Sequence, residues 1–208
     1  MTTAYEQAQR AGQGAVRATI LDAAGHLLVA EGPAALTVRR ISSEVGCSTK
    51  VIYTLFGGKD GLVEALWLEG FARFERCLTE ARTDPDPLVR LHEAGLAYRA
   101  YALREPDYYR VMFQGAVPGF TPSAQALAAA GRSFQILVTG VEECLAAGQL
   151  RGGSAREIAD LLWMAVHGAT SLEISGHLAE AIAEQRFTLL CIAVLSPFLP
   201  PPDERTPS

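Results

Sequence analysis

Residues 36–62, LTVRRISSEVGCSTKVIYTLFGGKDGL, carry the strongest structural signal in this chain. Thr37 can accept a hydrogen bond from the first turn of a short helix, because threonine is a favoured N-cap residue. Gly46 can adopt the left-handed conformation that ends such a helix, and Ser48 can cap a second short helix. The stretch therefore predicts a helix-turn-helix motif over about residues 37–56.

The second helix of this motif has two different faces. At about 100° per residue, its polar side chains fall together on one face: Thr49, Lys50, Tyr53 and Thr54. Ile52 and Leu55 lie opposite and can pack against the first helix. The exposed face can donate to base edges and phosphates in a major groove, which predicts a recognition helix. The alternative is that Lys50 and Lys59 are solvated surface side chains.

The rest of the chain shows helical patterns and no strand pattern. Helices are expected over about residues 16–30, from Lys59 into the seventies, and then over these later ranges: 88–104, 108–113, 123–147, from 154 onward and 180–196. Residues 1–13 are polar without an apolar period and are expected to be a flexible arm, and residues 200–208 a disordered tail. The fold class is all-α, with about nine helices that form a three-helix DNA-binding head and a larger C-terminal helical body.

The motif closely resembles the head of the tetracycline-repressor (TetR) family. The matching positions are Thr37, Gly46-Cys47-Ser48, Tyr53, Phe56 and Lys59. The resemblance implies that Thr49, Lys50 and Tyr53 approach bases or flanking phosphates. It also implies that a second set holds the DNA backbone: Thr37, Arg39, Ser48, Thr54 and Lys59. Thr37 could instead act only as a helix cap, and with Arg40 three residues later it lacks the acidic partner of a capping box.

The C-terminal part is similar to one branch of the same family. Residues 147–174 carry the resemblance through Trp163, His167 and Gly168, and residues 104–113 resemble the mid-domain turn of that branch. The similarity covers most of residues 14–198. We therefore expect a DNA-binding domain over 14–74 and a ligand-binding and dimerisation domain over 75–199.

Aromatic and sulfur-containing side chains accumulate in this larger region, and the resemblance implies that they line an apolar inducer cavity. The candidates are Trp67, Phe71, Phe74, Tyr98, Tyr101, Met112, Phe113, Phe134, Trp163 and His167. His167 is the candidate polar anchor. Each of these residues could also be ordinary core, and His167 a core histidine whose hydrogen bonds are satisfied.

The last two helices are apolar on more than one side, so a partner helix is expected to cover the exposed side. The resemblance implies a two-fold homodimer with a four-helix interface, for which the candidates are Gly168, Ser171, Leu172, Leu189, Ile192, Ala193 and Ser196. The two heads would then reach successive major grooves, about 34 Å apart, on a near-palindromic operator.

Charge and cysteine content fit this interpretation. The net charge is −5, yet residues 1–60 hold six Lys or Arg against five acids, whereas residues 61–208 hold 12 against 18. The four cysteines form no Cys-x-x-Cys pair and are expected to be buried thiols in a reducing cytoplasm. The longest apolar run, residues 187–199, covers 13 residues and includes Thr188, Ser196 and Pro197. It is shorter than the ~20 residues of a membrane-spanning helix.

The sequence thus predicts a ligand-responsive transcriptional regulator, most simply a repressor that a small apolar molecule releases from DNA. Two other classes stay open: a small helical enzyme, and a ligand-binding protein whose head does not bind DNA. An enzyme is disfavoured because the four histidines, His26, His92, His167 and His177, have no metal-ligand spacing. No cofactor or metal is expected. A repressor and an activator cannot be distinguished from the residues.

Overall fold

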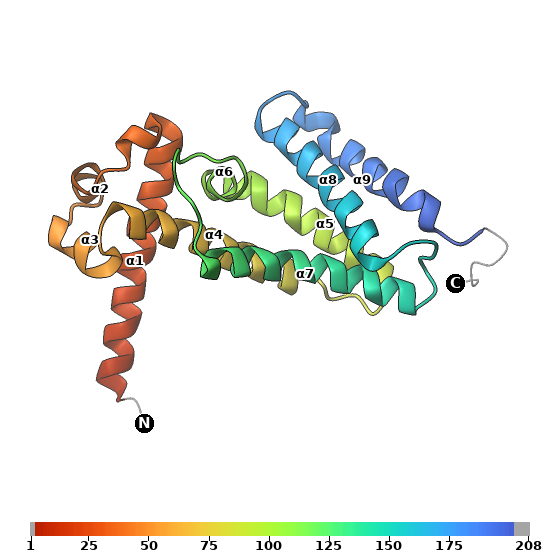
Figure 1. The fold of residues 1–208 in the computed structure, drawn as a ribbon, viewed down its shortest axis with the longest axis horizontal. Helices are drawn as coiled ribbons and strands as arrows, with labels where there is room; N and C mark the ends of the chain where they lie inside the picture. Colours follow the sequence, from red (N-terminus) through yellow and green to blue (C-terminus); the bar gives the residue numbers. More distant parts are fainter. Residues whose placement is uncertain (1–2, 202–208) are drawn as a thin grey trace. The chain divides into compact units, whose positions relative to one another are not determined.

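The structure is a computed structural model that describes residues 3–201 (Figure 1). In that range the chain forms nine α-helices, two short 3-10 helices and no strand, which confirms the all-α prediction. The α-helices are α1 (Ala4–Glu31), α2 (Val38–Val45), α3 (Thr49–Phe56), α4 (Lys59–Glu80), α5 (Pro87–Arg104), α6 (Pro106–Phe113), α7 (Ala124–Ala146), α8 (Ala155–Ile174) and α9 (Glu180–Leu195). The 3-10 helices are η1 (Pro33–Ala35) and η2 (Ser196–Phe198).

The first helix begins at Ala4 rather than near Gly14, so the expected arm is helical from Ala4 onward. The cause is local. Thr3 Oγ1 accepts a hydrogen bond from Glu6 N at 3.2 Å, and Glu6 Oε2 accepts one from Thr3 N at 2.9 Å, which together form a capping box. A search for an apolar period misses such a start, because the first turns of α1 are exposed.

The chain forms two compact units. Unit 1 comprises Met1–Ala72 and Asp107–Ala129, and unit 2 comprises Arg73–Pro106 and Ala130–Ser208. The sequence prediction places residues 107–129 in the body, whereas they group with the head. Contacts within unit 1 explain this: Tyr108 Oη on α6 donates to Asp22 Oδ1 on α1 at 2.8 Å.

The core of unit 1 is aliphatic and includes Ile20, Leu21, Leu36, Ile41, Ile52, Leu62 and Leu66, each with 0–1% of its surface exposed. It joins α1, α2, α3 and the first half of α4. The helix-turn-helix motif therefore packs against α1 and α4, as the amphipathic pattern of its helices predicts.

In unit 2, α8 packs against α5 and α9. One core cluster consists of Leu91, Val138, Val141, Cys144, Leu150, Ile158, Ala159, Leu162 and Phe198. A buried ion pair adds to these contacts, because Arg99 on α5 donates to both carboxylate oxygens of Glu173 on α8, at 2.8 and 2.7 Å. The same guanidinium reaches Glu184 on α9 at 3.2 Å. Arg99 thus connects all three helices.

The expectation that all four cysteines are buried is wrong for three of them. Cys144 is buried, whereas Cys47, Cys77 and Cys191 are half-buried.

The segment Glu180–Phe198 is long and apolar enough, by length and composition alone, to cross a membrane, although the apolar run expected from the sequence is shorter. One such helix among the described residues is weak evidence of a membrane span. Residues 202–208 of the expected tail lie outside the described range.

Candidate functional site

The turn between α2 and α3 has the geometry that its residues predict. Thr37 Oγ1 accepts a hydrogen bond from Arg40 N at 3.1 Å and so caps α2. Gly46 ends α2 with φ 73° and ψ 28°, a left-handed conformation that glycine adopts without steric cost. Ser48 precedes α3 as expected, but its side chain makes no capping hydrogen bond. The prediction that the Ser48 side chain caps α3 is therefore wrong.

The two faces of α3 differ as predicted. Ile52 is fully buried and Phe56 nearly so, with the Arg17 guanidinium of α1 stacked 5.5 Å from the centre of the Phe56 ring. Tyr53 is 57% exposed, although it is a large aromatic residue. All eight predicted DNA-contacting residues have exposed side chains: Thr37, Arg39, Ser48, Thr49, Lys50, Tyr53, Thr54 and Lys59. The polar face of α3 is thus accessible, while its contacts to DNA stay a prediction.

A close backbone contact fixes α3 against α4. A Cβ atom at Gly61, in the first turn of α4, would lie 1.9 Å from the carbonyl oxygen of Phe56, the last residue of α3. That distance is impossible for real atoms, and a backbone oxygen cannot rotate away. Glycine at position 61 therefore allows the end of the recognition helix to meet α4.

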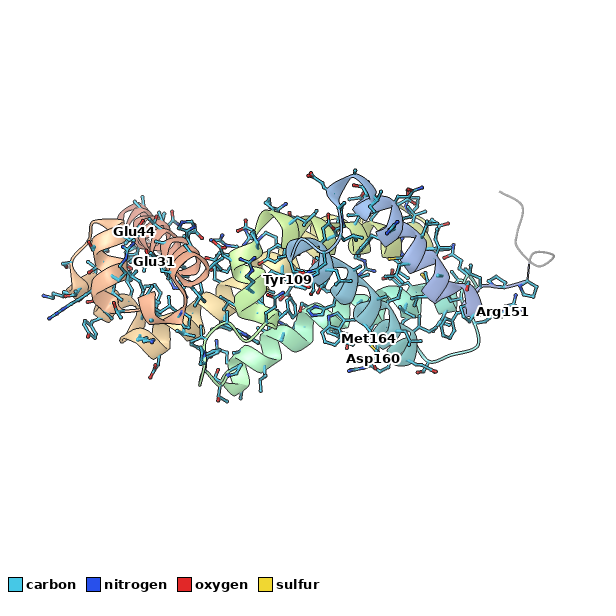
Figure 2. The ribbon with its side chains drawn as sticks, turned by 90° about the horizontal axis from the view of Figure 1, so that it is seen from above. Glu31, Glu44, Tyr109, Arg151, Asp160 and Met164 are labelled. Carbon is cyan, nitrogen blue, oxygen red and sulfur yellow. The ribbon has the colours of Figure 1, made fainter. Side chains whose placement is uncertain are left out.

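Arg40 forms an ion-pair cluster that the sequence prediction does not include. Its guanidinium donates to Glu31 at the end of α1, with 2.7 Å between Nη2 and Oε1, and to Glu44 Oε2 on α2 at 2.7 Å. Glu31 and Glu44 lie close together in Figure 2. The hydrogen bond from Arg40 lowers the pKa of Glu31, and the same bond is the main cause that raises the pKa of Arg40. Arg40 thus ties α2 to α1.

The predicted ligand-binding residues fall in both units. In unit 1, Trp67 lies 4.3 Å from Phe71, and Phe71 lies 5.4 Å from Phe113, measured between ring centres. Met112 contacts α4 at Gly70, where a Cβ would lie 2.8 Å from Met112 Sδ. The sequence predicts these four as part of one set, and the structure brings them together within the head.

The other six residues belong to unit 2. The ring of Phe74 lies 5.1 Å from those of both Tyr98 and Tyr101, and the ring of Trp163 lies 6.1 Å from Phe134 and 5.6 Å from His167. Phe74, Tyr98 and Tyr101 are buried, which also suits ordinary core. Whether these residues line a ligand site stays a prediction.

His167 is the polar member of this cluster. Its Nδ1 shares a hydrogen bond of 3.0 Å with Tyr98 Oη, which links α8 to α5. Burial lowers the pKa of His167, because a charged imidazolium would lose hydration. The ring is therefore neutral near neutral pH.

A pocket that the sequence does not predict lies within unit 1. It has a volume of about 610 Å³ between the first turns of α4 and residues 117–123, and Lys59, Asp60 and Glu64 are among its lining residues. Ser123 Oγ donates to Glu64 there. None of the ten predicted ligand-binding residues lines it. No local sequence pattern indicates this pocket, because the loop and the helix meet only in the folded chain.

The outer faces of α8 and α9 expose apolar side chains. The exposed fractions are 65% for Met164, 52% for Leu172, 56% for Leu189 and 54% for Ile192. Of the predicted interface residues, Ala193 and Ser196 are also exposed, and Gly168 and Ser171 are half-exposed. Asp160 and Met164, one turn apart on α8, are labelled in Figure 2. This face is available to a partner.

Two family models match the chain. Residues 20–66 match the model of bacterial regulatory proteins of the tetR family, and residues 91–194 match that of the tetracyclin repressor-like C-terminal domain. No curated protein matches the chain.

Solved structures agree with these matches. A protein of unknown function from a Rhodococcus species is 25% identical, with a TM-score of 0.77 over 89% of this chain and 96% of that one. The TetR-family transcriptional regulator PfmR from Thermus thermophilus is 18% identical, with a TM-score of 0.70 over 85% and 97%. A bacterial regulatory protein of the tetR family, also from Rhodococcus, is 20% identical, with a TM-score of 0.68 over 86% and 96%. At these identities the likeness to the last two establishes the fold.

Proposed function

Because this chain belongs to the tetracycline-repressor family of DNA-binding transcriptional regulators, which act as dimers on operator DNA, we propose that it is a repressor. In this proposal a small apolar molecule binds the body and releases the protein from a near-palindromic operator. The observation that carries the proposal is the exposed polar face of α3, which lies opposite a buried apolar face. The site of action is the cytoplasm, where operator DNA lies.

The exposed residues of the head would divide into two groups. Thr49, Lys50 and Tyr53 lie on the recognition helix and would contact base edges or flanking phosphates. The second group would hold the DNA backbone and set the register: Thr37, Arg39, Ser48, Thr54 and Lys59. Thr37 can serve both purposes, because it caps α2 and still has an exposed side chain.

The exposed apolar face of α8 and α9 would form the dimer interface. Leu172, Leu189 and Ile192 would lie at its centre, since burial of large apolar side chains drives association. Gly168, Ser171, Ala193 and Ser196 would allow close approach. A dimer interface would also cover the apolar segment Glu180–Phe198. Only 17% of its most apolar 18-residue stretch is buried within one chain.

Ligand binding would act through α4. This helix begins at Lys59, directly after the recognition helix, and continues to Glu80, so a shift of α4 would move α3. The inducer would bind among the aromatic residues of the body, with His167 as a polar anchor. The coupling requires only that the ligand prefer the state that does not bind DNA, with about 1–3 kcal/mol of difference.

The test of DNA binding is selection of bound duplexes from a random pool. We expect one near-palindromic sequence to be enriched by the wild type, and sequence preference to be lost in Tyr53→Ala and Lys50→Ala. Ser43→Ala, an exposed α2 residue outside the proposed set, is the matched control and should select the same sequence. Failure of the wild type to enrich any sequence would remove the proposal.

Repression and dimer formation are tested separately. A reporter under the selected operator should be silenced by the wild type, and activation instead of silencing would contradict the repressor role. For the interface, Ile192→Glu should give a monomer in sedimentation, because an unpaired charge is costly inside an apolar contact. Arg156→Glu, an exposed change near the start of α8 and outside the proposed interface set, should stay dimeric.

A further inference from the structure

Thr170 on α8 is fully buried, with 0% of its surface exposed, less than the buried Ser42 at 7% and Ser133 at 4%. Its Oγ1 has no hydrogen-bond partner among residues 3–201, the part that the structure describes. Native proteins pair nearly all buried hydroxyls, because an unpaired one loses its bonds to water without replacement. The state of Thr170 therefore requires an explanation.

Several other hydroxyls in or at the end of a helix are satisfied by the backbone of that helix. Each donates to a carbonyl oxygen three or four residues earlier, at 2.8–3.0 Å: Ser42, Thr54, Thr79, Ser133 and Ser175. Thr170 could reach the carbonyl of Val166 in the same way, yet it does not. Its hydroxyl is therefore unlike these five, since neither its own helix nor another described residue accepts or donates a hydrogen bond to it.

Thr170 lies on the same face of α8 as His167, one of the predicted ligand-binding residues. His167 precedes it by three residues, which places the two Cβ atoms roughly 5–6 Å apart on one helix face. His167 is hydrogen-bonded to Tyr98, whose ring meets Phe74 edge-on with 5.1 Å between ring centres. A few polar groups thus lie among large aromatic ones, the usual pattern for recognition of a small apolar molecule.

The charges nearby favour a neutral ligand. Burial keeps the pKa of His167 below its usual value, so the imidazole does not offer a positive charge near neutral pH. Arg99, which neighbours Tyr98 in the sequence, is already bound to the carboxylates of Glu173 and Glu184. A ligand carboxylate placed beside Thr170 would remain uncompensated, which is costly in a buried site.

We propose that the Thr170 hydroxyl anchors the inducer, and that the inducer is a neutral, largely apolar molecule with a carbonyl or hydroxyl oxygen. This inference rests on the proposed function, since it names the ligand class for the same sensory body. His167 and Tyr98 orient the ligand beside Thr170, and the aromatic rings bury its apolar part.

The first test needs no ligand. Thr170→Val keeps the shape of the side chain and removes the hydroxyl, so thermal unfolding should show an unchanged or higher Tm than the wild type. Thr170→Ser, which keeps the hydroxyl and opens a small cavity, should show a lower Tm. A Tm for Thr170→Val several degrees below that of both other proteins would mean that the fold uses the hydroxyl, and this would overturn the proposal.

The second test compares three probes of similar size by titration calorimetry: acetophenone, ethylbenzene and benzoate. The wild type and Thr170→Ser should bind acetophenone about tenfold more tightly than ethylbenzene, the effect of roughly one hydrogen bond. Thr170→Val should lose this difference and keep its affinity for ethylbenzene. Equal acetophenone binding by Thr170→Val and wild type, tightest binding of benzoate, or binding of no probe would each overturn the proposal.

Operator binding without ligand separates this inference from the proposed function. Thr170→Val and wild type should bind the selected operator with equal affinity, because Thr170 lies in unit 2 and outside the DNA-contacting set. If neither protein binds any duplex while the probe results hold, the repressor proposal fails and the ligand anchor remains.

Discussion

Arg40 and Glu31 form a two-point contact, in which Nη2 and Nε of the arginine lie 2.7 Å from Oε1 and 3.3 Å from Oε2 of the glutamate. They lie nine positions apart in the sequence, and the contact crosses from α2 to the end of α1. Arg40 is the third residue of α2, the position at which a capping box has an acidic residue. Its side chain instead binds Glu31 and so links α2 to α1. The contact orients α2, and through the turn it orients the recognition helix.

We predict that Arg40→Ala weakens operator binding by less than about tenfold and leaves its salt dependence unchanged, because phosphate contacts set that dependence. Lys59→Ala, by contrast, should reduce the salt slope by about one, because Lys59 belongs to the set proposed to hold the DNA backbone. The measurement is operator affinity over a series of salt concentrations. A reduced slope for Arg40→Ala would show that Arg40 contacts phosphate directly.

Acid should destabilise the protein through its paired carboxylates. Hydrogen bonds from Arg40 and Arg90 lower the pKa of Glu31 and Glu143 from the usual 4.5. A depressed pKa in the folded state contributes stability that is complete above pH 4.5 and is lost as the pH falls through the folded pKa. Urea unfolding at about pH 6 and about pH 3.5 should show this loss, and Glu143→Gln should show a smaller one. Equal losses in both proteins would refute the assignment.

Gly61→Ala should disturb the joint between α3 and α4. The added Cβ would lie 1.9 Å from the Phe56 carbonyl oxygen, so the helices must separate, at a cost of about 1–3 kcal/mol. Denaturant unfolding measures the loss of stability, and operator affinity should fall with it. Gly131→Ala on α7, where a Cβ meets nothing within 4 Å, is the control and should be neutral or stabilising. A Gly61→Ala variant as stable as wild type would contradict the contact.

The two carboxylates bound to Arg99 should differ in their effect on stability. Glu173 has a 7% exposed side chain and Glu184 a 73% exposed one, although both pair with the same guanidinium. Glu173→Ala leaves a buried charge poorly compensated and should cost about 3 kcal/mol, while Glu184→Ala should cost under about 1 kcal/mol. Similar values from denaturant unfolding would show that burial does not control the strength of this pair.

Local signals along the chain were sufficient to predict the helix-turn-helix motif and the all-α fold. Thr37 and Gly46 act on backbone groups within about four residues of themselves, and the two faces of α3 follow from helical periodicity alone. Such short-range signals can be recognised before folding. The capping box at Thr3 and Glu6 is also local, and it shows that a helix can begin where no apolar period exists.

Which distant residues meet depends instead on how the helices pack. Packing placed α6 with the head through Tyr108 and Asp22, which are 86 residues apart, and it divided the predicted ligand-binding residues between the two units. It also paired Arg40 with Glu31 and left the Thr170 hydroxyl buried without a partner among the described residues. Such contacts arise between whole helix faces, and one residue's chemistry does not specify the helix that will lie opposite it.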